Sequence, residues 1–457
     1  MNESLAALLH IDCPCGGIGK CGKCRIKADG KLSEPTEAER RLLGDLIDKG
    51  WRLACQTYPL GDFHADTSGD SELRSGKGSG ELVVDIGTTT IEVRLITQDG
   101  NIEAFALNPQ RRFGADVISR IGAADSYASE LTNELRDALS RLTEGFQYDR
   151  AVVTGNTVML HFLTGLDVSG LAGYPFSPSS LFGMWIDGET VGLHGRVYLP
   201  RCVSAFVGAD TVCALIKTAP KPDETTLLVD LGTNGELAFC AGKKIVCAST
   251  AAGPALEGAD ISSGMRAGEG AIDRVGYFPG NDPEIALQPG AITCADGILL
   301  PHVIGGGAAK GICGSGLISL IAALLNAGII DESGYLEAPF EIATGVSLTP
   351  QDVRAFQLAK SAIRTGISLI CDDGGIDRLC IAGNFGKGLD FAACRRTGLL
   401  PDCKRLDILG NAALSGAEML LSGADDNFVL EWKDLAADEQ FNELFTENLM
   451  FGKDETK

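Results

Sequence analysis

Two similar stretches, ELVVDIGTTTIEV (residues 81–93) and TLLVDLGTNGEL (residues 226–237), decide the fold of this chain. Each begins with leucines and valines that are typical of a buried strand, continues with Asp-x-Gly-Thr, and leads into a second strand. The aspartates at the two strand ends are Asp85 and Asp230. The repeat predicts two similar lobes that face each other across a cleft, where duplicated folds bind their ligands.

A second pair of similar segments follows in the same order. AVVTGNTVML (residues 151–160) and LCIAGNFGKG (residues 379–388) each read as a buried strand, then Gly-Asn, then the start of a helix. Two paired signatures indicate a duplicated α/β domain over residues 81–457. We expect a first lobe at about 81–220 and a second at about 221–457, with an insertion at about 255–375.

Composition excludes several classes of protein. The 457 residues carry 61 Asp and Glu against 39 Lys and Arg, a net charge of −22, so nucleic-acid binding is not expected. The uncharged residues 311–330 include four glycines, which predict a Gly-rich turn feeding a buried helix and no membrane span. The start, MNESLAALLHIDC, lacks the basic segment of a secretory signal, so a cytoplasmic location is expected.

Five of the 15 cysteines fall within residues 13–55. In a reducing compartment such clustering indicates metal binding or catalysis rather than disulfides. Three thiolates on a glycine-rich loop and a fourth from a distant segment suit a [2Fe–2S] cluster, whereas structural zinc, the alternative, prefers two close pairs. Cys13 is expected to be a non-ligating neighbour, residues 1–65 a cluster domain and the Gly- and Ser-rich residues 66–80 a linker. The predicted ligands follow the spacing Cys15-x5-Cys21-x2-Cys24-x30-Cys55.

The turn after each strand-end aspartate offers backbone N–H groups and hydroxyls that suit phosphate oxygens. One Asp-x-Gly-Thr alone is most simply a hairpin turn, but two at equivalent places favour a nucleotide such as ATP. Asp85 and Asp230 are the predicted catalytic carboxylates and would hold Mg²⁺ through waters, since Mg²⁺ takes only one or two carboxylates. The residues predicted to cradle the phosphates are Gly87, Thr88, Thr89, Gly232, Thr233, Asn234 and Gly235.

The two lobes resemble the acetate and sugar kinase/Hsp70/actin superfamily. DIGTTT (residues 85–90) is similar to its phosphate-1 motif, DLGTNGEL (230–237) to its phosphate-2 motif and IAGNFGKG (381–388) to its adenosine motif. The resemblance implies a duplicated ribonuclease H-like, two-lobed ATPase domain of α/β class. It also implies that purine and ribose lie against Gly383, Asn384, Phe385 and Gly386.

The loop GICGSG (residues 311–316) opens a predicted helix and is expected to face the nucleotide through Gly314 and Ser315. Cys313 is more simply a packed small residue than a nucleophile, because no base lies beside it in the sequence.

The cysteine pattern, together with LACQ (residues 53–56), resembles a small α+β [2Fe–2S] ferredoxin-like domain of the adrenodoxin type. Such domains normally open with a β-hairpin before their helix. This chain opens within the segment that is similar to the helix, ESLAALLHI (residues 3–11), so the domain is expected to be truncated.

The combination of these motifs over nearly the whole chain resembles the reductive activators of corrinoid proteins. The resemblance implies ATP-dependent reduction of inactive cob(II)alamin to cob(I)alamin, with one electron supplied by the cluster. The implied cofactors are a [2Fe–2S] cluster, ATP and Mg²⁺. The implied partners are a corrinoid protein and an external low-potential electron donor, and a homodimer is an open option.

Other functions stay open at this point. A small-molecule kinase would use the same cleft, with one aspartate as base, although phosphoryl transfer needs no cluster. Activators of 2-hydroxyacyl-CoA dehydratases also join such an ATPase to iron–sulfur chemistry, and a nucleotide sensor would bind without hydrolysis. Glu257 is either a carboxylate that lines the cleft or a surface or capping residue, and the five histidines are expected to be packing or surface residues.

Overall fold

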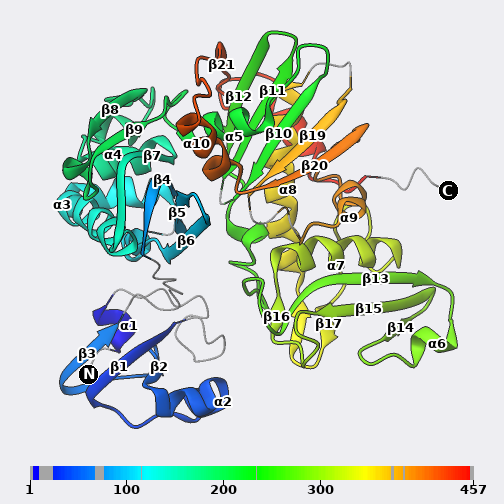
Figure 1. Ribbon diagram of the computed structural model, residues 1–457. Coiled ribbons are helices and arrows are strands. Elements are labelled where there is room, and N and C mark those ends of the chain that lie inside the picture. Colours follow the sequence, from blue (N-terminus) through cyan, green and yellow to red (C-terminus); the bar gives the residue numbers. More distant parts are fainter. Residues whose placement is uncertain are drawn as a thin grey trace. The chain divides into compact units, whose positions relative to one another are not determined.

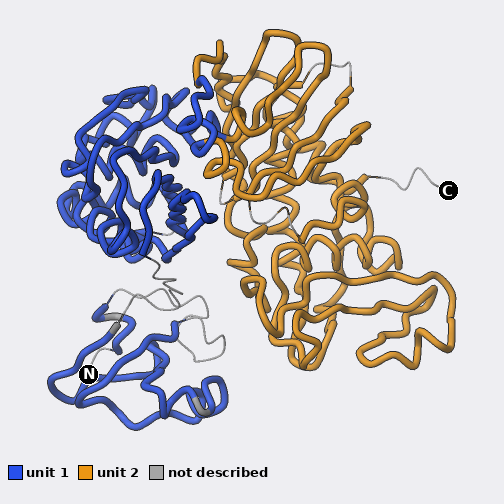
Figure 2. The backbone as a smooth tube through the Cα atoms, in the orientation of Figure 1, with its two compact units in different colours: residues 1–213, 417–425 blue, residues 214–416, 426–457 orange. Residues whose placement is uncertain are grey.

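The computed structural model describes residues 4–9, 24–66, 77–114, 116–232, 234–371, 375–383, 386 and 388–452. The chain divides into two compact units, residues 1–213 with 417–425 and residues 214–416 with 426–457 (Figure 1, Figure 2). Two of the three boundaries between the units fall inside helices, α5 (Ala209–Thr218) and α10 (Ala412–Leu421), and the third lies between α10 and β21.

The N-terminal part of the first unit is a three-stranded antiparallel sheet with the strand order β2-β1-β3. Its core is a small cluster in which Leu5, Ile26 and Leu53 are almost fully buried. The strands and helices support the predicted small α+β domain. They are α1 (Leu5–Leu8), β1 (Arg25–Leu32), α2 (Glu37–Leu43), β2 (Trp51–Leu53) and β3 (Pro59–Asp66), with a 3-10 helix, η1 (Gly44–Lys49).

A buried carboxylate, Glu39, holds this small sheet and α2 together. It accepts hydrogen bonds from Arg52 Nε (2.9 Å), the Leu53 N–H (3.0 Å) and the Thr57 hydroxyl (3.0 Å), and it completes the capping box of α2 with Thr36. Burial alone would raise the pKa of Glu39, but the bonds from Arg52, Thr36 and Leu53 outweigh it and hold the pKa below its usual range. The carboxylate is therefore ionised and fully paired at neutral pH.

The remainder of the first unit is a mixed six-stranded sheet with the order β6-β5-β4-β7-β9-β8. The first three strands form an antiparallel meander, β7 joins β4 in parallel, and helices α3 and α4 pack on the sheet. Because β3 ends at Asp66 and β4 begins at Gly78, strand structure reaches into both ends of the predicted linker, residues 66–80. The elements are β4 (Gly78–Ile86), β5 (Thr90–Thr97), β6 (Gly100–Leu107), α3 (Val117–Leu142), β7 (Phe146–Gly155), α4 (Thr157–Thr164), β8 (Met184–Asp187) and β9 (Arg196–Leu199).

The second unit repeats the same plan in a sheet with the order β20-β19-β10-β11-β12-β21. Again three consecutive strands form an antiparallel meander, and the first of them is joined in parallel by a later strand, here β19. The predicted duplication is therefore confirmed by topology (Figure 1). The strands are β10 (Thr226–Leu231), β11 (Gly235–Ala241), β12 (Lys244–Thr250), β19 (Arg378–Ala382), β20 (Arg405–Gly410) and β21 (Leu430–Trp432).

The predicted insertion, at about 255–375, adds a second sheet to this unit but also supplies part of the lobe itself. Helix α8 packs against β11 and β12, and helix α7 packs against β13. One continuous core contains Leu237 of the lobe sheet, Leu320 of α7 and Phe356 of α8. The inserted elements are β13 (Ala271–Pro279), α6 (Pro283–Ala286), β14 (Ile292–Cys294), β15 (Gly297–Val303), β16 (Gly311–Ile312), α7 (Gly314–Asn326), β17 (Phe340–Ala343), β18 (Val346–Leu348) and α8 (Pro350–Ile370).

Helix α7 is buried along nearly all of its length, which confirms the buried helix predicted for residues 311–330. No helix among the described residues is long and apolar enough to cross a membrane.

Replacing Glu39 with alanine should destabilise the N-terminal sheet by roughly 3–5 kcal/mol, because Arg52 would be left buried without its partner. Trp51 fluorescence during urea unfolding reports on this sheet, once the exposed Trp185 and Trp432 are replaced with Phe. The matched control is Glu37→Ala in the same helix, where the side chain is exposed, and its effect should stay within about 0.5 kcal/mol. Equal effects of the two substitutions would contradict this account.

Candidate functional site

Two of the four predicted cluster cysteines lie side by side in the small N-terminal domain. Cys24 precedes β1 and Cys55 follows β2, and the pairing of Arg25 with Leu53 brings these strand ends together. The two Sγ atoms are 3.1 Å apart, and both side chains are buried. That distance exceeds the roughly 2.0 Å of a disulfide, so the two sulfurs are not bonded to each other and lie close enough together to serve one cluster. Cys13, Cys15 and Cys21 lie outside the described residues.

The ten cysteines from Cys202 onward have a different character, and seven of them are buried. Burial raises the pKa of Cys202 and Cys240 to about 12 and that of Cys380 to about 11. Such thiols are rarely ionised at neutral pH and are weak nucleophiles and ligands. Cys313 is buried too, with its Sγ 3.3 Å from the Ser315 hydroxyl, as expected for a packed small residue.

The turn at residues 87–89 of the first lobe is held by hydrogen bonds to its carbonyl groups. The side chain of Asn108 donates to the Gly87 carbonyl (2.8 Å), and its backbone N–H donates to the Thr89 carbonyl (2.9 Å). Arg120 of α3 donates from Nη2 to the Thr88 carbonyl (2.5 Å). Because Asn108 and Arg120 are both fully buried, all three carbonyls are directed into the lobe.

Asp85 lies at the end of β4 immediately before this turn, opposite Thr154 of β7. Gly155 follows in β7, and a Cβ there would lie 2.7 Å from the Ile86 carbonyl oxygen. Only glycine therefore allows the two parallel strands to end so close together.

In the second lobe, Asp230 and Gly383 stand in the equivalent relation at the ends of β10 and β19. Gly383 has a φ of +83°, and a Cβ on it would lie 2.8 Å from the Asp230 Oδ1 atom. The Asp230 carboxylate therefore lies directly against the start of the segment predicted to bind adenosine. In the turn that joins β10 to β11, the Gly232 N–H donates to the Asn234 carbonyl (3.0 Å).

The other end of that segment lies beside the first turn of α7. A Cβ on Gly388 would lie 3.4 Å from the Ser315 hydroxyl oxygen, and Gly314 begins the helix. Three separately predicted stretches, at Asp230, at residues 383–388 and at Ser315, are thus neighbours within the second unit. Gly386 donates its N–H to the Gly383 carbonyl (3.2 Å), whereas Thr233, Asn384 and Phe385 lie outside the described residues.

Gly235 and the 3-10 helix that contains Glu257 lie against helices of the second unit. A Cβ on Gly235 would lie 3.2 Å from Ile363 of α8, so this glycine allows the helix to pack on β11. Glu257 ends a 3-10 helix, η5 (Pro254–Glu257), which packs against α7 and α8.

Comparison with known proteins follows the same division of the chain. Residues 224–456 match the model of the C-terminal domain of RACo, the ASKHA domain; residues 81–220 match the RACo middle region; and residues 2–60 match a 2Fe-2S iron-sulfur cluster binding domain. The corrinoid activation enzyme RamQ of Eubacterium limosum is 31% identical over 433 residues, which cover 81% of this chain and 70% of that protein.

The chain belongs to the RACo family. A second relative, the [Co(II) methylated amine-specific corrinoid protein] reductase of Methanosarcina barkeri, is 27% identical over 378 residues, covering 74% of this chain and 69% of that protein. A solved structure of a reductive activator for corrinoid, iron-sulfur protein matches with a TM-score of 0.67 and 25% identity, covering 98% of this chain and 95% of that one. The predicted combination of a [2Fe–2S] domain with an actin/Hsp70-like domain is confirmed.

Asp210 is a candidate functional residue of this RACo-family chain, and the sequence patterns did not identify it. It lies in the first turn of α5. Gly208, just before this helix, packs closely against the backbone at the end of β7, since a Cβ on Gly208 would lie 2.4 Å from the Asn156 Cα. Desolvation on burial raises the pKa of Asp210 to about 6, and the hydrogen bond that its Oδ1 accepts from the Thr211 N–H (2.8 Å) offsets only part of this effect. A carboxyl group that titrates near neutral pH suits proton transfer.

The described histidines are packing or surface residues, as predicted. His161 is fully buried, and its Nε2 accepts the Ser180 N–H (3.3 Å), which leaves Nδ1 to donate to the Thr157 carbonyl (2.7 Å). His64, His194 and His302 are exposed, and His10 lies outside the described residues.

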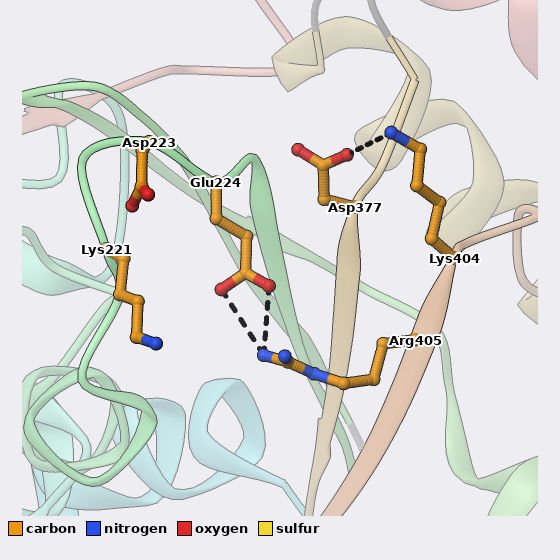
Figure 3. Close-up of a pocket in the computed structure, with 6 residues that line it drawn as sticks. All are labelled: Lys221, Asp223, Glu224, Asp377, Lys404 and Arg405. Atoms are coloured by element: carbon orange, nitrogen blue, oxygen red, sulfur yellow. Dashed lines mark hydrogen bonds and ion pairs between the residues drawn. The ribbon is translucent and has the colours of Figure 1, made fainter.

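A separate pocket of about 390 Å³ lies at the opposite end of the second-lobe sheet (Figure 3). Its lining residues come from the starts of β19 and β20 and from the segment before β10, whereas ligands of such sheets bind at the carboxyl ends of the strands. Lys404 pairs with Asp377 (2.7 Å) and Arg405 with Glu224 (2.9 Å), so its charges are largely balanced internally. The six side chains are Lys221, Asp223, Glu224, Asp377, Lys404 and Arg405.

Cys55→Ala and Cys24→Ala should each abolish the bound iron and the visible absorption of a [2Fe–2S] cluster, since the two thiols lie together as one half of the predicted ligand set. Iron analysis and absorption spectroscopy of the purified protein test this. Cys202→Ala, at a buried thiol outside the cluster motif, should keep the full iron content. Full iron retention in Cys55→Ala would refute the ligand assignment.

Asp210→Asn should stabilise the protein above pH 6 by roughly 2–3 kcal/mol and have little effect near pH 4. Between the usual carboxyl pKa and about 6, the folded state binds the proton that the unfolded state has lost, so wild-type stability falls as the pH rises through this window. Urea unfolding at several pH values measures the difference. Asp137→Asn, at an exposed carboxylate of α3, is the control, and a stabilisation by Asp210→Asn that does not depend on pH would contradict the raised pKa.

Proposed function

We propose that this chain is an ATP-dependent reductive activator that transfers one electron to a corrinoid protein and reduces cob(II)alamin to cob(I)alamin. The observation that carries the proposal is the buried Cys24–Cys55 thiol pair on the same chain as two lobes with strand-end aspartates. The named activities of the two relatives support a corrinoid protein as partner. When bound, the cluster supplies a single electron at low potential, and an external low-potential donor would then reduce the cluster again.

Each group of residues has a distinct role in this proposal. Cys15, Cys21, Cys24 and Cys55 bind the cluster. Asp85 and Asp230 hold Mg²⁺ through waters, and the turns that follow them bind the phosphates of ATP. The segment at residues 383–388, which begins against Asp230 and ends against Ser315, contacts adenosine.

Burial of the Cys24 and Cys55 side chains would affect the reduction potential of the cluster. With water excluded on this side, the dipoles of the protein would set the polarity around the two thiolates. If ATP changes the affinity of the chain for its corrinoid partner, the partner changes the affinity for ATP by the same factor. ATP hydrolysis can then separate the two proteins after reduction.

A corrinoid protein in the cob(II)alamin state, mixed with this chain, a low-potential reductant and Mg·ATP, should show the visible absorption of cob(I)alamin. Omitting ATP should suppress this signal, because the coupling requires nucleotide. Asp230→Asn should lower ATP hydrolysis at least about 100-fold while leaving the iron content unchanged, since it removes a carboxylate from the nucleotide site only.

Two outcomes would overturn the proposal. One is the absence of ATP-dependent cob(I)alamin with a protein that is shown to contain its cluster. The other is stoichiometric phosphorylation of a small metabolite, which would identify a kinase.

A further inference from the structure

A buried cation lies directly behind the phosphate turn of the first lobe. Arg120 is fully buried, and its guanidinium donates to four neutral acceptors. They are the carbonyls of Thr88 (2.5 Å) and Gly114 (3.0 Å), the Gln110 side chain (3.4 Å) and the Met159 sulfur (3.5 Å). No carboxylate in the described part of the chain forms an ion pair with it. A buried charge without a counter-ion is costly, so its retention requires an explanation.

The nearest acidic residue on the same helix is committed elsewhere. Asp116 caps α3, and its Oδ1 accepts both the N–H and the hydroxyl of Ser119 at 2.7 Å. Asp116 favours the charged guanidinium only through space, while burial lowers the pKa of Arg120 to about 10. The guanidinium therefore stays protonated at neutral pH without a bonded anion.

The turn itself shows where an anion would fit. A trans peptide directs its C=O and N–H in opposite directions. The carbonyls of Gly87 and Thr88 are bound from inside the lobe by Asn108 and Arg120, so the N–H groups of Thr88 and Thr89 point away from it. Neither N–H has an acceptor in the described part of the chain. Two outward N–H groups with a cation behind them form an anion site.

We propose that Arg120 is a positioning residue for the nucleotide, whose guanidinium fixes and polarises the Thr88–Thr89 peptide and whose charge is balanced by the phosphates on the far side of that peptide. This inference rests on the proposed ATP binding. In a chain of net charge −22, such local positive charge offsets the general repulsion of a polyphosphate.

The test compares ATP affinity, measured by titration calorimetry, among Arg120→Gln, Arg120→Lys and a matched control. Arg120→Gln keeps an N–H donor for the Thr88 carbonyl but removes the charge, and it should weaken ATP binding about 10- to 100-fold. Arg120→Lys keeps the charge and should recover binding to within about fivefold of wild type. The control is Arg136→Gln, on the same helix, where Nε donates to the Leu163 carbonyl (3.0 Å) away from the turn, and it should bind ATP normally.

A second measurement separates electrostatics from simple loss of structure. The salt dependence of ATP affinity should be shallower in Arg120→Gln than in wild type, and unchanged in Arg120→Lys and Arg136→Gln. Wild-type affinity or wild-type salt dependence in Arg120→Gln would overturn the inference, as would an equal loss in Arg136→Gln. If the wild-type protein bound no ATP, the proposed function itself would be wrong. That result differs from the outcomes for the Arg120 and Arg136 variants, which test only the role of Arg120.

Discussion

The parallel pairing of two strand ends is the constraint on which both lobes depend. In each lobe, an aspartate is the second-last residue of the first meander strand, and a parallel neighbour ends beside it, as Asp85 pairs with Thr154 and Asp230 with Ala382. The chain leaves both neighbouring strands through a glycine with no room for a side chain, Gly155 or Gly383. The same local geometry, an aspartate beside a closely packed glycine, therefore occurs in both lobes. It sets the position of a carboxylate and a turn at the carboxyl edge of each sheet.

Much of this arrangement could be predicted from the sequence, because it depends on local patterns. Short apolar runs and Asp-x-Gly turns are sufficient to define two meanders, and the topology of both sheets agrees. The contact between Cys24 and Cys55 likewise agrees with the predicted set of four ligands, which rests on the spacing of cysteines around a glycine-rich loop. These features share one property, which is that residue type and spacing alone carry the signal.

The buried side chains that hold the turns of the site in place could not be predicted in the same way. Asn108 and Arg120 reach the turn at residues 87–89 from later in the chain, and neither belongs to a motif that marks a carbonyl-binding role. Gly235 is predicted to contact phosphate because it stands in DLGTNGEL, and this motif does not indicate that its missing side chain also makes room for Ile363, more than a hundred residues later. Contacts of this kind depend on how helices pack on the sheet, which periodicity does not specify.

The buried charges of the chain differ in how each is compensated. Glu39 and Arg52 neutralise one another within the small N-terminal domain, and their role there is structural. Lys360 is buried against the C-terminal segment, donating to the Met450 carbonyl (2.5 Å), and burial lowers its pKa to about 8, so it can lose its charge at modest cost.

Arg120 has neither of these solutions, because it has no bonded carboxylate in the described residues and its pKa of about 10 keeps it charged. In the proposed complex, its charge is balanced by phosphates bound at the N–H groups of Thr88 and Thr89, on the far side of the peptide that Arg120 holds. A charge that is costly in the protein alone and balanced in the proposed complex contributes to binding affinity and not to stability. The position of Arg120 thus connects the packing of α3, which folds without any ligand, to the affinity of the phosphate turn.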